Sequence, residues 1–241
     1  MKTRLIYILS FLTLATAQMG CRKKTNDTTP VKDVPRQAYV QWFNGTLNST
    51  RNFMYVNGIQ INGTTNSFGG VFPSGAYSSA VYSGSSGITI KDTLSTSTQV
   101  AQNFVQELET GKSYTIFTYD TITSPKRLIA ENGTSVLNGT NARVRFLNII
   151  YNPTPPPTVD IFSVNQNNFV VMNLPVAQLT NFFEIAPGVS DTWQVRQSGT
   201  TTVMASLAIS TSSLMPNRRY TFVYRGSHRA AANRGAALIA N

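Results

Sequence analysis

Two stretches, Ala38-Tyr-Val-Gln-Trp-Phe-Asn44 and Ala142-Arg-Val-Arg-Phe-Leu-Asn148, decide the fold class of this chain. Each alternates apolar and polar residues, is rich in aromatic and β-branched side chains, and ends at an asparagine. Strict alternation over such a length is typical of a half-buried β-strand. The same strand pattern therefore occurs twice, about 100 positions apart.

Further blocks recur in the same order around these two strands. Towards the ends of the repeats, Lys112-Ser-Tyr-Thr-Ile-Phe-Thr-Tyr119 matches Arg218-Arg-Tyr-Thr-Phe-Val-Tyr224, and Leu128-Ile-Ala-Glu-Asn132 matches Leu238-Ile-Ala-Asn241. Two shorter matches lie between, Phe53–Asn57 with Val159–Ser163 and Phe72–Gly75 with Ile185–Gly188. A repeat of about 100 residues fits one sandwich domain, whereas solenoid units usually have 20 to 50.

The rest of the chain after Ala38 also reads as β-structure, since no stretch repeats apolar residues at helical spacing. We therefore predict an all-β protein of two tandem immunoglobulin-like antiparallel β-sandwich domains. The predicted strands are short and bounded by Gly, Asn, Pro or Ser: 39–43, 52–56, 76–82, 98–106, 114–119, 143–148, 158–164, 182–185, 192–197, 202–209 and 220–224.

The first 20 residues have the three parts of a secretory signal peptide. Lys2 and Arg4 precede the apolar run Leu5–Ala17, which ends in small residues before Gly20 and Cys21. As a helix this run would span about 20 Å, against about 30 Å for a bilayer core. It is too short to remain as a membrane span.

Cys21, the only cysteine of the chain, lies where cleavage would fall. Gly20 and Cys21 resemble the end of a bacterial lipoprotein signal of the Bacteroidetes type, although Gln18 and Met19 depart from its usual small or aliphatic residues. The resemblance implies lipidation of Cys21 and an outer-membrane lipoprotein of the cell envelope, on either its periplasmic or its surface face. The alternative is a free thiol in a normally cleaved secreted protein.

The domain boundaries follow from these features. We predict a signal peptide at 1–20, a polar and proline-containing tether at 21–37, one sandwich at 38–132 and another at 142–241. A single cysteine excludes an intramolecular disulfide, so hydrophobic burial has to stabilise both sandwiches.

The charge favours no particular partner. The chain carries a net charge of +10, and because two of its cationic residues and no acidic ones lie in residues 1–20, cleavage would leave +8. Only 12% of residues are charged, and the basic ones are scattered rather than gathered in a stripe. We therefore expect no nucleic-acid partner, and a basic surface that favours acidic envelope components only through its general field.

Each repeat resembles the bacterial domain-of-unknown-function family 4397. The resemblance rests on Arg143–Asn148, Thr158-Val-Asp-Ile-Phe162 and Ala186-Pro-Gly188 in the second repeat, while in the first Phe53 and Met54 replace the Val-Asp pair. It covers nearly the whole chain after the signal and implies an extracellular sandwich, often in tandem and on lipoproteins. It implies no chemistry and no cofactor.

The side chains that enzymes use are sparse. The chain has one histidine, His228, in an arginine-rich segment without a nucleophile pattern, and no histidine pair at metal-ligand spacing. Carboxylates that could act in pairs on a glycosidic bond are Glu107, Glu109, Asp160, Glu184 and Asp191. We expect no catalytic residues, no metal and no cofactor.

Aromatic rings offer a second route to function, because Trp and Tyr stack on sugars and on partner proteins. Trp42, Trp193 and Asp160 are the candidate ligand contacts, with packing in the core as the alternative for both tryptophans. We therefore expect a lipid-anchored, non-enzymatic binding, adhesion or assembly module, whose partner is an envelope glycan or another surface protein. The alternative is a glycan-binding or carbohydrate-processing lipoprotein.

Overall fold

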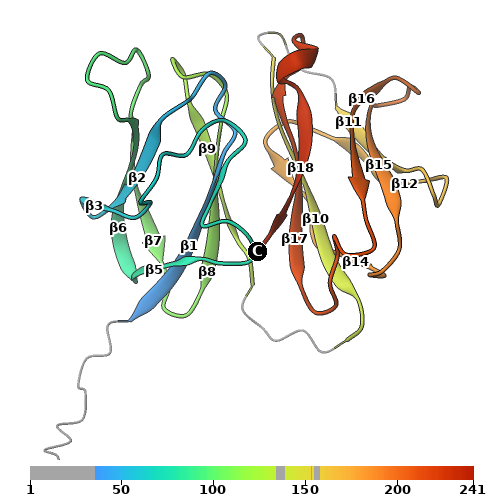
Figure 1. Ribbon diagram of the computed structural model, residues 1–241, viewed down its shortest axis with the longest axis horizontal. Helices are drawn as coiled ribbons and strands as arrows, with labels where there is room; N and C mark the ends of the chain where they lie inside the picture. Colours follow the sequence, from blue (N-terminus) through green and yellow to red (C-terminus); the bar gives the residue numbers. More distant parts are fainter. Residues whose placement is uncertain (1–35, 134–138, 153, 155–157) are drawn as a thin grey trace, which may run out of the picture. The chain divides into compact units, whose positions relative to one another are not determined.

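The computed structural model describes residues 36–133, 139–152, 154 and 158–241. The predicted signal peptide, Cys21 and nearly all of the predicted tether lie outside these residues. The described chain is all-β, with one short 3-10 helix, η2 (Ala231–Asn233) (Figure 1). The fold class predicted from the sequence is therefore confirmed, whereas the immunoglobulin-like type of the sandwiches stays a prediction.

The first half, residues 36–133, contains nine strands that form two sheets. One sheet has the order β4-β1-β8-β9, with β5 also paired to β1, and the other has the order β3-β2-β6-β7. The strands are β1 (Gln37–Asn44), β2 (Asn52–Val56), β3 (Ile59–Gln60), β4 (Val71–Phe72), β5 (Ser79–Tyr82), β6 (Gly84–Asp92), β7 (Gln102–Leu108), β8 (Ser113–Tyr119) and β9 (Lys126–Glu131).

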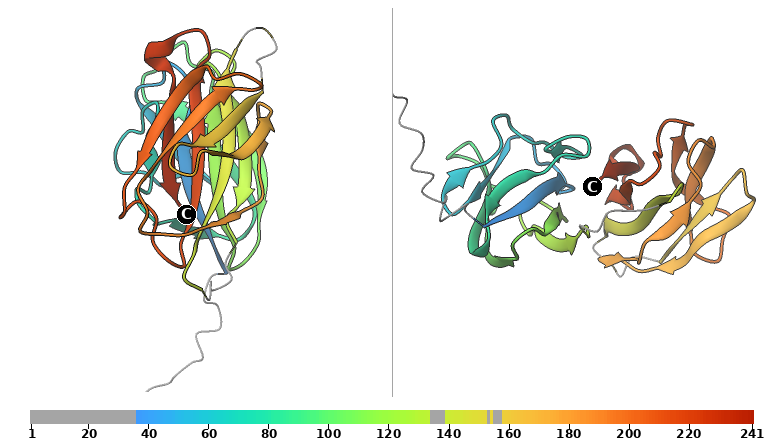
Figure 2. Two further views of the ribbon diagram at one scale, coloured as in Figure 1. Left: turned by 90° about the vertical axis from the view of Figure 1, so that its right-hand side faces the viewer. Right: turned by 90° about the horizontal axis from the view of Figure 1, so that it is seen from below.

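The second half, from residue 139 on, repeats this topology strand by strand. Its sheets have the orders β13-β10-β17-β18, with β14 also paired to β10, and β12-β11-β15-β16 (Figure 2). The strands are β10 (Ala142–Tyr151), β11 (Val159–Ser163), β12 (Asn168–Leu174), β13 (Gln178–Leu179), β14 (Phe183–Ile185), β15 (Asp191–Gln197), β16 (Val203–Ile209), β17 (Arg219–Ser227) and β18 (Gly235–Ala240).

The register confirms the longest matched blocks of the repeat. β1 runs parallel to β8 with Tyr39 opposite Ser113, and β10 runs parallel to β17 with Arg143 opposite Arg219. In the final block, Asn132 and Asn241 are equivalent, as predicted. Leu238, however, corresponds to Ile129 rather than to Leu128. Ile129 pairs with Ile116, and Leu238 pairs with Phe222, the residue equivalent to Ile116.

Two shorter matches are wrong in detail. Val71 and Phe72 pair with Phe43 and Trp42, but Ile185 pairs with Ala142, whose counterpart Ala38 pairs with Val81. Val81, not Phe72, is thus the equivalent of Ile185.

The second wrong match is displaced by one residue along the strand. Met54 and Val56 point into the first core, whereas Val159 and Ile161 point into the second. Because side chains alternate between the two faces of a sheet, pairing Met54 with Asp160 would set a core residue against an outer one.

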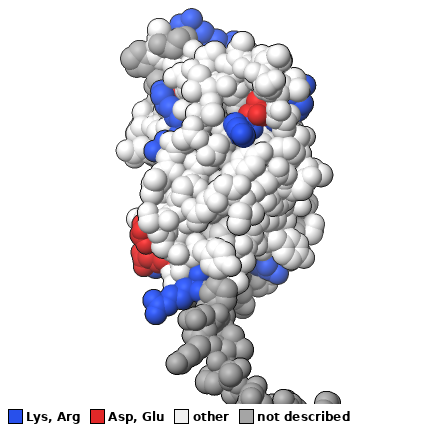
Figure 3. All heavy atoms as spheres, turned by 90° about the vertical axis from the view of Figure 1, so that its left-hand side faces the viewer, with Lys and Arg blue, Asp and Glu red and all other residues white. Residues whose placement is uncertain are grey.

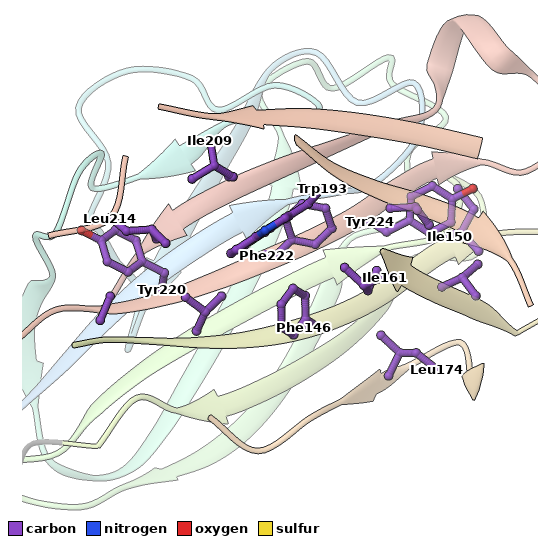
Figure 4. Close-up of a cluster of buried hydrophobic side chains, with 14 residues drawn as sticks. Phe146, Ile150, Ile161, Leu174, Trp193, Ile209, Leu214, Tyr220, Phe222 and Tyr224 are labelled. Atoms are coloured by element: carbon purple, nitrogen blue, oxygen red, sulfur yellow. The ribbon is translucent and has the colours of Figure 1, made fainter. Parts of the chain in front are cut away.

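Each half buries its own apolar core between its two sheets. The first core includes Trp42, Met54, Ile88 and Ile116, and the second packs Phe146, Trp193 and Phe222 with ring centroids 5.4–5.6 Å apart (Figure 4). A third buried cluster draws on both halves: Phe43, Phe117, Tyr119, Ala130, Leu147, Ile149, Val223 and Ile239. Residues 36–241 accordingly form one compact unit.

A polar network built from equivalent positions of the two repeats also joins the halves. Gln41 of β1 donates to the carbonyl of Ala240 (3.0 Å), and its counterpart Arg145 of β10 donates to the carbonyl of Glu131 (2.7 Å). Gln41 also accepts a bond from Asn241 (3.2 Å). The contact between the halves is therefore close to self-complementary, as in a twofold dimer.

Candidate functional site

The two tryptophans predicted as ligand contacts lie in the cores instead. Trp42 is fully buried, and its Nε1 donates to Thr118 Oγ1 (3.1 Å). Trp193 is 2% exposed, packs against Phe146 and Phe222 in the second core (Figure 4), and donates to Asp191 Oδ2 (2.9 Å). Both rings are enclosed in the cores, so neither is exposed to a sugar or a partner.

Asp160, the third predicted contact, is also buried and holds a turn. Its Oδ1 accepts from the backbone N–H of Asn173 and from Ser198 Oγ, both at 2.7 Å, and its Oδ2 accepts from Gly199 N–H (3.1 Å). These bonds join β11 to the end of β12 and to the turn that follows β15. The carboxylate is thus structural, and the prediction of ligand contact at Asp160 is corrected.

The other described carboxylates are mostly engaged in the same way. Asp191 accepts from Ser163, Trp193 and two backbone N–H groups, while Glu184 pairs with Arg143 at 3.3 Å. Glu109 and Glu131 both pair with Lys112, and Asp120 pairs with Lys126. Within the described residues, no group of three or more His, Cys, Asp or Glu side chains is placed to hold a metal ion.

A groove on the first half brings aromatic and polar side chains together at the surface. It has a volume of about 450 Å³ and lies over β2, β6 and the segment 93–101. The alternation of β2 turns Phe53 and Tyr55 away from the core that receives Met54 and Val56, so both rings are partly exposed. In Figure 3, which faces this side of the molecule, charged side chains gather mainly towards the two ends and much of the middle is uncharged.

The polar groups of this groove are held in place by the segment after β6. Asp92 accepts from the backbone N–H of Leu94 (2.9 Å) and from Ser97 Oγ (3.0 Å), and Arg51 lies 3.6 Å away. Burial works to raise the pKa of Asp92, but these hydrogen bonds and the guanidinium outweigh it and lower that pKa below its ordinary value. The groove wall is therefore ordered by an ionised carboxylate.

Gln99 supplies an unused acceptor to the same groove. Its Nε2 donates to Asn52 Oδ1 (2.7 Å), while its Oε1 is buried and has no hydrogen-bond partner within the protein. The ammonium of Lys91 lies 5.1 Å from the centre of the Tyr55 ring. Rings beside a free acceptor and a cation can bind a hydroxyl-rich, partly apolar ligand such as a sugar.

The sequence contains one signal for this groove, which the prediction of Trp42 and Trp193 as ligand contacts did not use. In Asn52-Phe-Met-Tyr-Val56 a period of two sets Phe53 and Tyr55 against Met54 and Val56. Two aromatic residues on the polar side of a strand indicate an exposed aromatic surface. The position of Gln99 could not be predicted, because it depends on the path of the loop after β6.

Comparisons with known proteins identify no relative: no family model matches the chain, and no curated protein is significantly similar to it. The resemblance to domain-of-unknown-function family 4397 therefore stays a prediction. In the part of the chain that the structure describes, no helix has the length and apolar character needed to cross a membrane.

Proposed function

We propose that the protein is a non-enzymatic binding, adhesion or assembly module, held at the outer membrane of a bacterial cell envelope by a lipid on Cys21. The observation that supports this proposal most is that the described carboxylates have structural roles. Seven of the eight that are described accept hydrogen bonds or form ion pairs that hold turns and strand edges. The surface instead has sheet faces and shallow grooves, which can bind a ligand or a partner protein.

The anchor is tested at the cysteine itself. In Cys21→Ser, the side chain that would receive the acyl groups is lost, so the protein should leave the membrane fraction and take up no radiolabelled palmitate. The wild-type chain in the same cells is the matched control. Continued palmitate labelling of the variant would contradict the proposal.

A second candidate function, binding of envelope glycans, is favoured by the groove at Phe53, Tyr55 and Gln99. Sugar rings stack their C–H faces on aromatic side chains, and Phe53 and Tyr55 line this groove together with the polar side chains of Lys91 and Gln99. Such a site needs no catalytic residue. It would make the first half the ligand-binding part of an otherwise structural protein.

We expect the purified chain to bind a subset of neutral or hydroxyl-rich sugars on a glycan array, and Tyr55→Ala to weaken that binding about fivefold or more, since one lost aromatic contact is worth about 1–3 kcal/mol. Tyr77→Ala is the control, because Tyr77 is 74% exposed and lies outside the groove. Equal loss in both variants, or binding that survives Tyr55→Ala, would rule out the groove as the glycan site.

A further inference from the structure

A second unusual place lies in the second half, where η2 connects β17 to β18. Four side chains there have buried polar atoms without a hydrogen-bond partner within the protein: Tyr224 Oη, Arg225 Nε, His228 Nδ1 and Arg234 Nε. The guanidinium of Arg225 stacks on Phe68 of the first half, which leaves the other three to be explained. Tyr224 itself is fully buried. A buried polar group left unpaired destabilises the fold, so three together at one end of a sandwich call for a physical cause.

The backbone brings these residues together. The N–H of His228 donates to the carbonyl of Tyr151 (2.9 Å), and Arg234 Nη1 donates to the carbonyl of His228 (2.8 Å). On the paired strands Tyr224 lies opposite Ala236, two residues after Arg234. Asn152, which follows β10 at the same end, also has a buried Oδ1 without a partner.

Among the residues that the structure describes, no carboxylate pairs with the positive charge at this end. Within the described residues neither Arg229 nor Arg234 takes part in an ion pair, and Arg229 has only a long contact of 3.4 Å with Thr154 Oγ1. Burial, and then Arg234 and Arg229, lower the pKa of His228, while burial raises the pKa of Tyr224 to about 12 against the opposing effect of Arg234. The side chains therefore lie within one another's electrostatic field.

Two occupants could satisfy such a group, water or an anion. Water would complete the hydrogen bonds of a hydroxyl and an imidazole. It would leave the charges of two neighbouring guanidinium groups, one of them partly buried, without compensation. An oxyanion supplies both the missing acceptors and the missing negative charge.

We propose that this end of the second half binds a phosphate-class oxyanion, with Tyr224 Oη, His228 Nδ1 and Arg234 Nε as hydrogen-bond donors. Arg229 adds charge at the rim. A phosphate that keeps one proton also carries a hydroxyl, which can donate to Asn152 Oδ1. The chemistry is shared by free phosphate, phosphorylated sugars and lipid headgroups, and it is independent of the groove on the first half.

The test uses the purified full-length chain titrated with inorganic phosphate, with chloride as the control at equal ionic strength. We expect phosphate alone to raise Tm in a saturable way. Backbone amide NMR shifts should concentrate in residues 224–236 and 150–152. Shifts spread over all basic residues, or no rise beyond that in chloride, would overturn the proposal.

Two variants make the test specific. Tyr224→Phe removes only the hydroxyl, and Arg234→Gln removes the charge, so each should weaken phosphate binding about tenfold or more. Arg127→Gln is the matched control, because Arg127 stacks on Phe104 in the first half and should bind phosphate like the wild type. If Tyr224→Phe binds phosphate as tightly as the wild type, the proposed donor set is wrong. If Arg234→Gln does not fold, phosphate binding by Arg234→Lys and Tyr224→Phe is compared with that of the wild type instead.

Vesicles distinguish the source of the anion. If the site recognises a lipid headgroup, vesicles of phosphatidylglycerol should bind the chain, free phosphate should compete, and Tyr224→Phe should lose both. If it recognises soluble phosphates, phosphate should bind and any vesicle binding should survive Tyr224→Phe. A third outcome would contradict the proposal: the chain binds the vesicles even as Tyr224→Phe but does not bind free phosphate. The vesicles would then be attracted only by the overall positive charge of the chain.

Discussion

Arg145 makes two hydrogen bonds from the second half to the first. It is 3% exposed, and it donates to the carbonyl of Glu131, to Asn132 Oδ1 and to Thr221 Oγ1 at 2.7–3.0 Å. Its guanidinium lies 4.8 Å from the centre of the Phe182 ring. Burial lowers its pKa to about 10, so it stays protonated at neutral pH, its charge held by neutral oxygens rather than by a carboxylate.

Arg145→Ala should therefore lower the free energy of unfolding by about 2–4 kcal/mol, because it removes a hydrogen-bond donor from two acceptors of the first half, the carbonyl of Glu131 and Asn132 Oδ1. Urea unfolding followed by tryptophan fluorescence measures this loss. Arg145→Gln is the matched variant, since glutamine occupies the equivalent position 41, and it should lose less. A loss below about 0.5 kcal/mol in Arg145→Ala would mean that the network contributes little.

The inner strands explain how much of the fold the sequence could predict. β1, β8, β10 and β17 were placed correctly, because apolar runs such as Tyr-Thr-Ile-Phe in β8 are strong strand signals. These runs also put neighbouring residues on opposite faces of a sheet, and both faces are buried: Ile116 and Phe222 point into the cores, Phe117 and Val223 into the shared cluster. This double-sided apolar character marks a sheet covered on both sides.

One strand that the sequence did not predict, β6, lacks such a signal at its start. β6 begins with Gly84-Ser-Ser-Gly87, a composition typical of a loop, yet it lies between β2 and β7 and pairs with both. Tertiary pairing overrides local preference there.

The ligand contacts were misplaced for a related reason. Tryptophan is suited both to a core and to a binding surface, and the alternation of β1 could not tell which face would be covered.

The connection between β17 and β18 makes stability depend on pH. In the folded chain, burial and the guanidinium groups of Arg234 and Arg229 hold the pKa of His228 below its ordinary value of 6.5. The unfolded chain therefore binds this proton more readily, and the stability contributed by neutral His228 is present above about pH 6.5 and is lost as the pH falls through the folded pKa.

His228→Asn should accordingly flatten the fall in stability between about pH 7 and pH 5. Because His228 is the only histidine of the chain, the difference between the two curves of unfolding free energy against pH reports this group alone. Curves that stay parallel over this range would show that the histidine is equally exposed to solvent and charge in both states.

At the scale of the whole described molecule, the repeat makes two sandwiches that bury matching faces against each other. Thr115 donates to Asn132 Oδ1 (3.1 Å), and its counterpart Thr221 donates to Asn241 Oδ1 (2.6 Å). The polar centre repeats itself across the contact, with an apolar cluster around it. Separate expression of 38–132 and 142–241 would expose these faces to water, so the halves should depend on each other for stability although each has its own core.

Differential scanning calorimetry of the full-length chain tests this mutual dependence most directly. The apolar cluster and the network are lost together when either half unfolds, so we predict one cooperative transition with equal calorimetric and van't Hoff enthalpies. Arg145→Ala should lower the midpoint temperature of this transition and begin to separate it into two. Two separate transitions in the wild-type chain, each unmoved by Arg145→Ala, would show that the halves are independent domains and that the contact between them adds nothing to their stability.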